Sequence, residues 1–243
     1  MIFGTGLVKL SNNKIKEKTM DIPDQPIRQL PGIGKLIAEA LRIYKKKFLV
    51  FLSLTAIPLV WFLLFPILRA DWLICLLVFI ILELWTSASL IHVVNNREKT
   101  IGFKEAMANG WPRIISFFWV SFLTGLISII GFVLLIIPGI IFSVWYVFSK
   151  YVFISEGLKG MAALKRSKEL VRGFWWKVFW RFVGFGFIVF VVMIPVTVVM
   201  EILDSSGLML LGEILGLVLN ALIAPLGIVY GFLIYENLKR AKG

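Results

Sequence analysis

Residues 48–68 read FLVFLSLTAIPLVWFLLFPIL and contain no charged side chain. A transmembrane helix needs about 20 mostly apolar residues, because an α-helix rises about 1.5 Å per residue and the hydrocarbon core is about 30 Å thick. A single open strand could not replace the helix there, because its backbone groups would be left unpaired in hydrocarbon. This stretch therefore predicts a membrane-spanning helix.

Five further stretches meet the same criterion of length and apolarity. The sequence therefore predicts an all-α integral membrane protein with six transmembrane helices in three hairpins. They belong to one domain, residues 33–240, which follows a basic segment, residues 1–32, that we expect to be disordered because prolines interrupt it. Met20 within that segment is an alternative start. The predicted spans are about 48–68, 72–94, 114–138, 139–157, 178–200 and 208–235.

The composition of the 243-residue chain excludes a soluble fold. Apolar residues make up 59% and charged residues 16%, with a mean hydropathy of +0.91, whereas a soluble domain has about 45–50% and about 25%. Cys75 is the one cysteine and His92 the one histidine, which excludes a disulfide within the chain and any mechanism that needs two histidines. No hydrolase, zinc-protease or phosphate-loop motif is present, so we predict no catalytic residue, metal or cofactor.

The Lys and Arg residues are segregated along the chain. All 26 except Arg69 lie in or beside the segments on one side of the predicted spans. Because cytoplasmic segments carry the excess of cations, we place both termini in the cytoplasm and the protein in the cytoplasmic (inner) membrane. The net charge of +12 is then an insertion signal and an attraction for anionic lipids. It does not predict nucleic-acid binding, because no domain presents stacking aromatics with it.

A short amphipathic segment precedes each predicted hairpin. In the first, Leu36, Ala40 and Tyr44 recur at helical spacing. Short helices with cations on one face suit the membrane interface, so we expect three interfacial helices on the cytoplasmic side and a threefold repeat. Any three spans that start inside would share this pattern without being repeats. The residues expected to bind lipid headgroups are Lys45, Lys46, Lys47, Lys165, Arg166, Lys168 and Arg172.

Small residues recur every four positions in the last span. The series consists of Gly212, Gly216, Asn220 and Ala224, and Gly227 and Gly231 continue the face with a modest rotation. Such a face lets helix backbones approach closely in lipid. We expect it to pack inside the monomer; a dimer interface is the alternative.

Three polar residues lie at similar depths in the spans predicted to run inward. Glu83, Lys150 and Asn220 each follow the outer end of their span by 11 or 12 positions, about 16–18 Å into the bilayer. Intramembrane polar groups are candidates for function, so the three define a candidate binding layer for an ion, a solute or a lipid headgroup. The alternative, which we favour, is structural: an ion pair between Glu83 and Lys150.

Three segments in the middle of the chain resemble a known group. They are residues 103–114 (FKEAMANGWPRI), residues 134–149 (LLIIPGIIFSVWYVFS) with Pro138-Gly139 at the expected turn, and residues 156–176. They resemble a prokaryotic group of six-span inner-membrane proteins that includes the membrane domain of some glycerophosphoryl diester phosphodiesterases. The resemblance implies the six-span fold and the inner-membrane location. It supplies no catalytic residue, because that activity belongs to a separate barrel domain that this sequence does not contain.

Three functional hypotheses follow from these patterns. The first is a membrane protein without catalytic activity that organises lipids or membrane partners through its basic interfacial helices; its partners are anionic lipids and other membrane proteins, not nucleic acid. The second is a small transporter or channel that uses the layer of Glu83, Lys150 and Asn220, since transporters bind at the midplane. An enzyme acting on lipid is the third.

Overall fold

The computed structural model describes residues 30–68 and 71–242, and every regular element in these ranges is helical. Residues 1–29, which hold most of the predicted disordered segment and Met20, lie outside the described residues. The all-α prediction is confirmed for the rest. The helices are α1 (Ile33–Lys46), α2 (Phe48–Leu68), α3 (Trp72–Asn95), α4 (Phe103–Gly110), the 3₁₀ turn η1 (Trp111–Arg113), α5 (Ile114–Leu134), α6 (Ile136–Tyr146), α7 (Ser149–Glu156), α8 (Gly160–Val171), α9 (Trp175–Ser205) and α10 (Met209–Lys242).

Several helical stretches are long and apolar enough to cross a membrane. Within the described residues there are five, and a sixth if α1 and α2 are taken together. The predicted membrane-spanning character is therefore confirmed at this level. The five stretches are Trp72–Asn95, Phe103–Leu134, Ile136–Glu156, Trp175–Ser205 and Leu210–Lys242.

The first interfacial helix and the first predicted span meet at a sharp bend. The axes of α1 and α2 differ by 84°, and Lys47 between them leaves the helical conformation. Leu36 and Ala40 are buried on one face of α1, while Lys45 and Lys46 are exposed at its end. On the far side of the α2–α3 connection, Asp71 caps α3 by accepting a hydrogen bond from the Leu73 amide at 2.8 Å.

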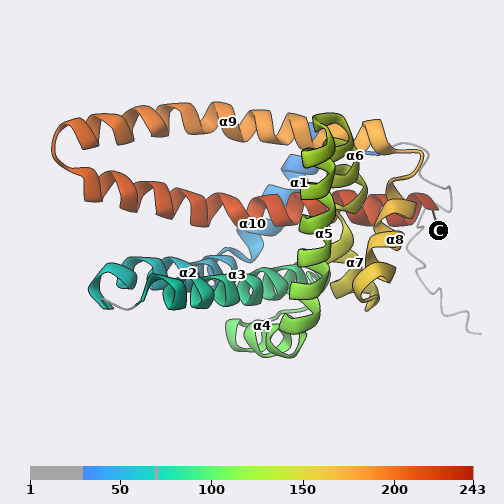
Figure 1. Cartoon of the computed structure of the whole chain (residues 1–243), viewed down its shortest axis with the longest axis horizontal. Helices are drawn as coiled ribbons and strands as arrows, with labels where there is room; N and C mark the ends of the chain where they lie inside the picture. Colours follow the sequence, from blue (N-terminus) through green and yellow to red (C-terminus); the bar gives the residue numbers. More distant parts are fainter. Residues whose placement is uncertain (1–29, 69–70, 243) are drawn as a thin grey trace, which may run out of the picture.

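Two long hairpins set the main direction of the molecule. α2 with α3, and α9 with α10, extend side by side toward the same end (Figure 1). The α9–α10 turn at that end contains Gly207 at φ +75°, a left-handed conformation that favours glycine. We call this the turn end. The other end, which carries α8 and the last residues of α10 with Lys239, Arg240 and Lys242, we call the basic end.

The small face of α10 packs within the chain. A Cβ at Gly212 or Gly216 would contact Met200 of α9, one at Gly227 would contact Phe185 of α9, and one at Gly231 would collide with the Tyr151 hydroxyl of α7. The expectation that these glycines pack inside the monomer is confirmed.

The hairpin of α5 and α6 does not follow the direction of the other two. It runs across them near the basic end (Figure 1). The three helix pairs therefore do not share one direction, and the crossing of the membrane by each of them stays a prediction. The predicted turn at Pro138-Gly139 is wrong. The chain turns at Leu135, which is extended at φ −166°, and Pro138 lies in the first turn of α6, where its missing amide has no partner to lose. Gly139 instead packs against α5 at Gly131.

The core lies toward the basic end, around the second half of α10. Tyr230 and Tyr235 of α10, Phe148 before α7, Phe51 of α2 and Phe117 of α5 are all fully buried. α10 packs against α1, α2, α3, α8 and α9. By contrast, the most apolar stretch of α9 has no buried residue, so this helix presents its surface to the surroundings.

Candidate functional site

A basic groove lies between α1 and the connection from α3 to α4. Its volume is about 490 Å³. α1 supplies one wall because its apolar face is turned to the core, which leaves its charged face outward. The charged residues that line the groove are Lys35, Glu39, Arg42, Lys46, Lys47, Arg97 and Glu98.

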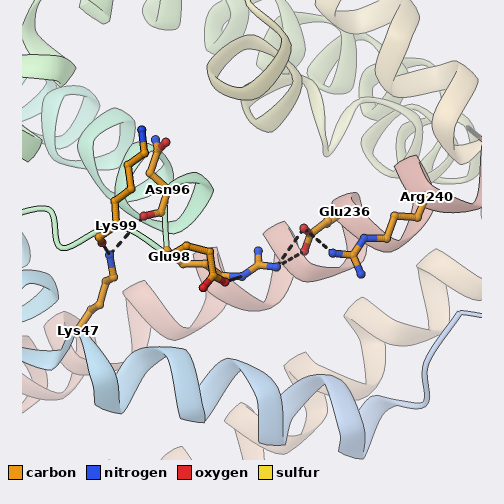
Figure 2. A network of polar contacts seen from close by, with 7 residues as sticks. Lys47, Asn96, Glu98, Lys99, Glu236 and Arg240 are labelled. Carbon is orange, nitrogen blue, oxygen red and sulfur yellow. Dashed lines mark hydrogen bonds and ion pairs between the residues drawn. The ribbon is translucent and has the colours of Figure 1, made fainter. Parts of the chain in front are cut away.

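Lys47 fixes the floor of the basic groove. Its Nζ donates to the carbonyl oxygen of Lys99 at 2.6 Å and to that of Asn96 at 3.5 Å (Figure 2), and the residue is only 8% exposed. Carbonyls at and beyond the end of a helix lack partners in that helix. Lys47 donates hydrogen bonds to two such carbonyls after α3. Burial lowers the pKa of its ammonium group. The expectation that Lys47 binds a lipid headgroup is therefore wrong, because its donors face carbonyls inside the protein.

An ion-pair chain ties the far wall of the groove to α10. Arg97 Nη2 donates to Glu236 at 3.0 Å, and Arg240 Nη2 donates to the same carboxylate at 3.0 Å (Figure 2). Glu98 lies 3.7 Å from Arg97 Nε but is largely exposed, so that pair contributes little. These contacts hold the α3–α4 connection against α10 and keep the groove open beside α1.

Three cations of the groove remain available for a ligand. Lys35, Arg42 and Lys46 are exposed, and within residues 30–68 and 71–242 none of them forms an ion pair. Glu39 and Glu98 offset part of this charge. A guanidinium and two ammonium groups around one groove provide what a phosphate or another anion needs.

The predicted headgroup residues of α8 have different surroundings. Lys165 is exposed, whereas Lys168 Nζ lies 4.2 Å from the centre of the Trp145 ring. Arg166 donates to Glu156 at 3.1 Å, so part of its charge is neutralised within the protein. Arg172 is exposed, and its carbonyl accepts a hydrogen bond from Lys242 at 2.6 Å.

The predicted polar layer is only partly brought together. Glu83 and Asn220 line one cavity of about 250 Å³ between α2, α3 and α10, together with Thr55. Lys150 does not line it, and its Nζ lies instead 5.8 Å from the centre of the Phe117 ring. In the part of the chain that the structure describes, Glu83 and Lys150 form no ion pair within 4.0 Å. The predicted pair is therefore not formed by direct contact, although Glu83 still attracts the Lys150 ammonium group from a greater distance.

Two interactions at the basic end were missed by sequence reasoning. Glu156 accepts a hydrogen bond from Tyr235 at 2.7 Å and pairs with Lys239 at 3.6 Å, which joins α7 to α10. Arg181 donates to the carbonyls of Leu30 and Pro31, at 2.7 Å each from Nη2. A buried aromatic near a carboxylate separated by many residues leaves no local pattern, so neither partner was visible in the sequence.

No family model matches the chain, and neither a curated protein nor a solved structure is significantly similar to it. The resemblance to the six-span inner-membrane group therefore stays a prediction. The fold itself defines a coarser class: an all-helical protein with several helices long and apolar enough to span a membrane.

Proposed function

We propose that this is a multi-pass protein of the cytoplasmic membrane, without catalytic activity, that binds anionic lipid headgroups in the basic groove and thereby organises lipids or membrane partners. Both termini lie in the cytoplasm. The observation that carries the proposal is the set of Lys35, Arg42 and Lys46 around a groove of about 490 Å³, unpaired within the described residues.

The position of the groove supports a lipid rather than a dissolved anion. α1 lies at 84° to α2, so if α2 spans the membrane, α1 lies close to the membrane plane. Tyr44 and the exposed lysines at the end of α1 are residues typical of the headgroup level. Each cation near an anionic surface contributes about 1 kcal/mol, so removing two should weaken binding by about 2 kcal/mol, or about 30-fold.

The test compares two variants with the same change in charge. Arg42→Gln with Lys46→Gln removes cations of the groove, and Lys104→Gln with Lys159→Gln removes exposed cations of α4 and of the α8 N-terminus. Retention of phosphatidylglycerol and of phosphatidylcholine is measured by native mass spectrometry of the full chain. We expect the groove variant alone to lose phosphatidylglycerol, with phosphatidylcholine unchanged. An equal loss in both variants would show that net charge, not the groove, attracts the lipid.

The basic face of α8 is a second headgroup surface in this proposal. Lys165→Gln with Lys168→Gln should reduce phosphatidylglycerol retention further when it is added to the groove variant. Arg166 is left unchanged in that test because it holds Glu156. Additive losses support two surfaces, and no further loss limits the proposal to the groove.

A second candidate function is transport through the cavity of Glu83, Asn220 and Thr55. The observation that favours it is an exposed carboxylate and an exposed amide at one opening between α2, α3 and α10. Proton flux into vesicles containing the reconstituted protein and a pH-sensitive dye tests it. Glu83→Gln should abolish the flux, while Glu213→Gln near the turn end should not. The absence of flux in the unmodified protein would rule this candidate out for protons.

A further inference from the structure

We propose that the α5–α6 hairpin lies within the cytoplasmic leaflet instead of crossing the bilayer, so that the chain crosses the membrane four times, through α2, α3, α9 and α10. The surface that the hairpin presents is then an interaction surface whose partner is the acyl-chain layer of one leaflet. This inference does not depend on what the basic groove binds, because it rests on other residues.

The tip of the hairpin packs beside the wrong end of α9 for a transmembrane hairpin. Just past the tip at Leu135, Ile137 and Ile140 of α6 line one groove of about 590 Å³ with Trp176 of α9. The neighbouring Trp175 donates from Nε1 to the Ile141 carbonyl at 3.4 Å. α9 begins at Trp175 and continues for 31 residues, about 46 Å. A hairpin that crossed the bilayer would bring its tip to the turn end of α9, not to its first turns.

The middle of the apolar stretch Ile136–Glu156, which α6 and α7 form together, lies against the cationic helix α8. Ser167 of α8 donates from Oγ to the Trp145 carbonyl of α6 at 2.7 Å, and Lys168 of α8 lies over the ring of the same tryptophan. The cations of α8 cannot lie at the bilayer centre without a large cost. If the stretch Ile136–Glu156 crossed the bilayer, its middle at Trp145 would have to lie there. The two placements are incompatible, and the contacts place this part of the chain at the level of α8.

The hairpin surface nevertheless requires an apolar environment. Val133 is 80% exposed, and Leu135, Ile136 and Ile137 beside it are each about 70% exposed. A patch of this kind is unfavourable in water. At the turn, the Leu135 amide donates to Gly131 at 3.1 Å and the Leu135 carbonyl accepts from Gly139 at 3.2 Å. These backbone groups are therefore satisfied, and the tip can enter lipid without a large penalty.

The contacts of the hairpin with α9 and with α8 agree with its direction in the structure. α5 and α6 run across α2, α3, α9 and α10 (Figure 1), so when those four helices lie along the bilayer normal the hairpin lies near the membrane plane. A hairpin returns to the side on which it starts. The number of crossings therefore stays even, and the segregation of cations in the sequence is preserved.

Thiol labelling of the full chain in intact cells tests the placement. In a Cys75→Ala background, Leu135→Cys marks the hairpin tip, and Ser206→Cys marks the α9–α10 turn as the control on the outer side. A membrane-impermeant maleimide applied from outside should label position 206 and leave position 135 unlabelled. Labelling of position 135 at the rate of position 206 would overturn the inference.

A cross-linking experiment keeps the test decisive if position 135 is unreactive because lipid covers it. Ile140→Cys is paired with Trp176→Cys near the start of α9, or with Val198→Cys near its turn end, and a bismaleimide with a spacer of about 10 Å is added to membranes. The hairpin in the leaflet joins 140 to 176 and not to 198. A cross-link between 140 and 198, or none between 140 and 176, would refute it.

Discussion

Tyr235→Phe measures how much the contact between α7 and α10 contributes to stability. Tyr235 is 1% exposed, and its hydroxyl donates to Glu156 Oε1 at 2.7 Å. Hydrogen bonds to charged acceptors contribute about 1.5–3 kcal/mol. The carboxylate keeps Arg166 at 3.1 Å and Lys239 at 3.6 Å, so the substitution does not leave it without a partner. We therefore expect the free energy of unfolding to fall by about 1.5–3 kcal/mol.

The assay is reversible unfolding in mixed micelles with increasing dodecyl sulfate, followed by circular dichroism. Tyr146→Phe is the matched control, because its hydroxyl makes no hydrogen bond within residues 30–68 and 71–242, and it should change the free energy by less than about 0.5 kcal/mol. If Tyr235→Phe changed the free energy of unfolding as little as the control does, the contact would contribute nothing measurable to stability. If both variants lost the same amount, general repacking of tyrosine rings would explain the loss.

Three further substitutions probe the close packing and the buried cations. Gly131→Ala should destabilise the protein by about 1–3 kcal/mol, because its Cβ would lie 2.9 Å from the Gly139 Cα. The control is Gly125→Ala, whose Cβ would have no atom of another residue in contact within 4 Å, and it should be neutral or stabilising. Burial lowers the pKa of Lys47 in the folded protein, so the unfolded chain binds that proton more tightly. The free energy of unfolding should therefore rise with pH toward about 10.4. Lys47→Met should remove this part of the pH dependence in unfolding curves measured at several pH values. Arg181→Lys cannot reproduce a fork to two carbonyls, so amide hydrogen exchange at the start of α1 should accelerate.

The first hairpin was predictable because its signals are local. The lysines before Phe48 and the uncharged stretch after it place the end of α1 and the bounds of α2 where the structure has them. Apolar residues at helical spacing, including Leu36 and Ala40, indicate which face of α1 is buried. Lys47 continues the spacing of that buried face, one turn beyond Tyr44, and this signal could have separated it from the exposed Lys45 and Lys46.

The direction of the α5–α6 hairpin could not be predicted from apolarity. Residues 114–134 satisfy the criterion of length and composition whether the helix crosses the bilayer or lies in one leaflet, since both environments are hydrocarbon. What distinguishes the two is contact with residues far along the chain, such as Ser167 with Trp145 and Trp175 with Ile141. Pro138 added a second error, since proline marks a turn or a first helical turn equally well.

The placement of this hairpin changes which polar residues belong together. Lys150 lies in the first turn of α7 and does not line the cavity of Glu83, although Glu83 is close enough to attract its ammonium group. α2 contains no charge, and the cavity beside it is formed by Thr55, Glu83 and Asn220 from three of the four crossing helices. Within the described residues Glu83 forms no ion pair within 4.0 Å, and Lys150 of α7 attracts it only from a greater distance. A ligand that supplies a proton, a cation or a hydrogen-bond donor would complete the partners of this carboxylate, which makes Glu83→Gln the substitution that separates a binding cavity from a packing gap.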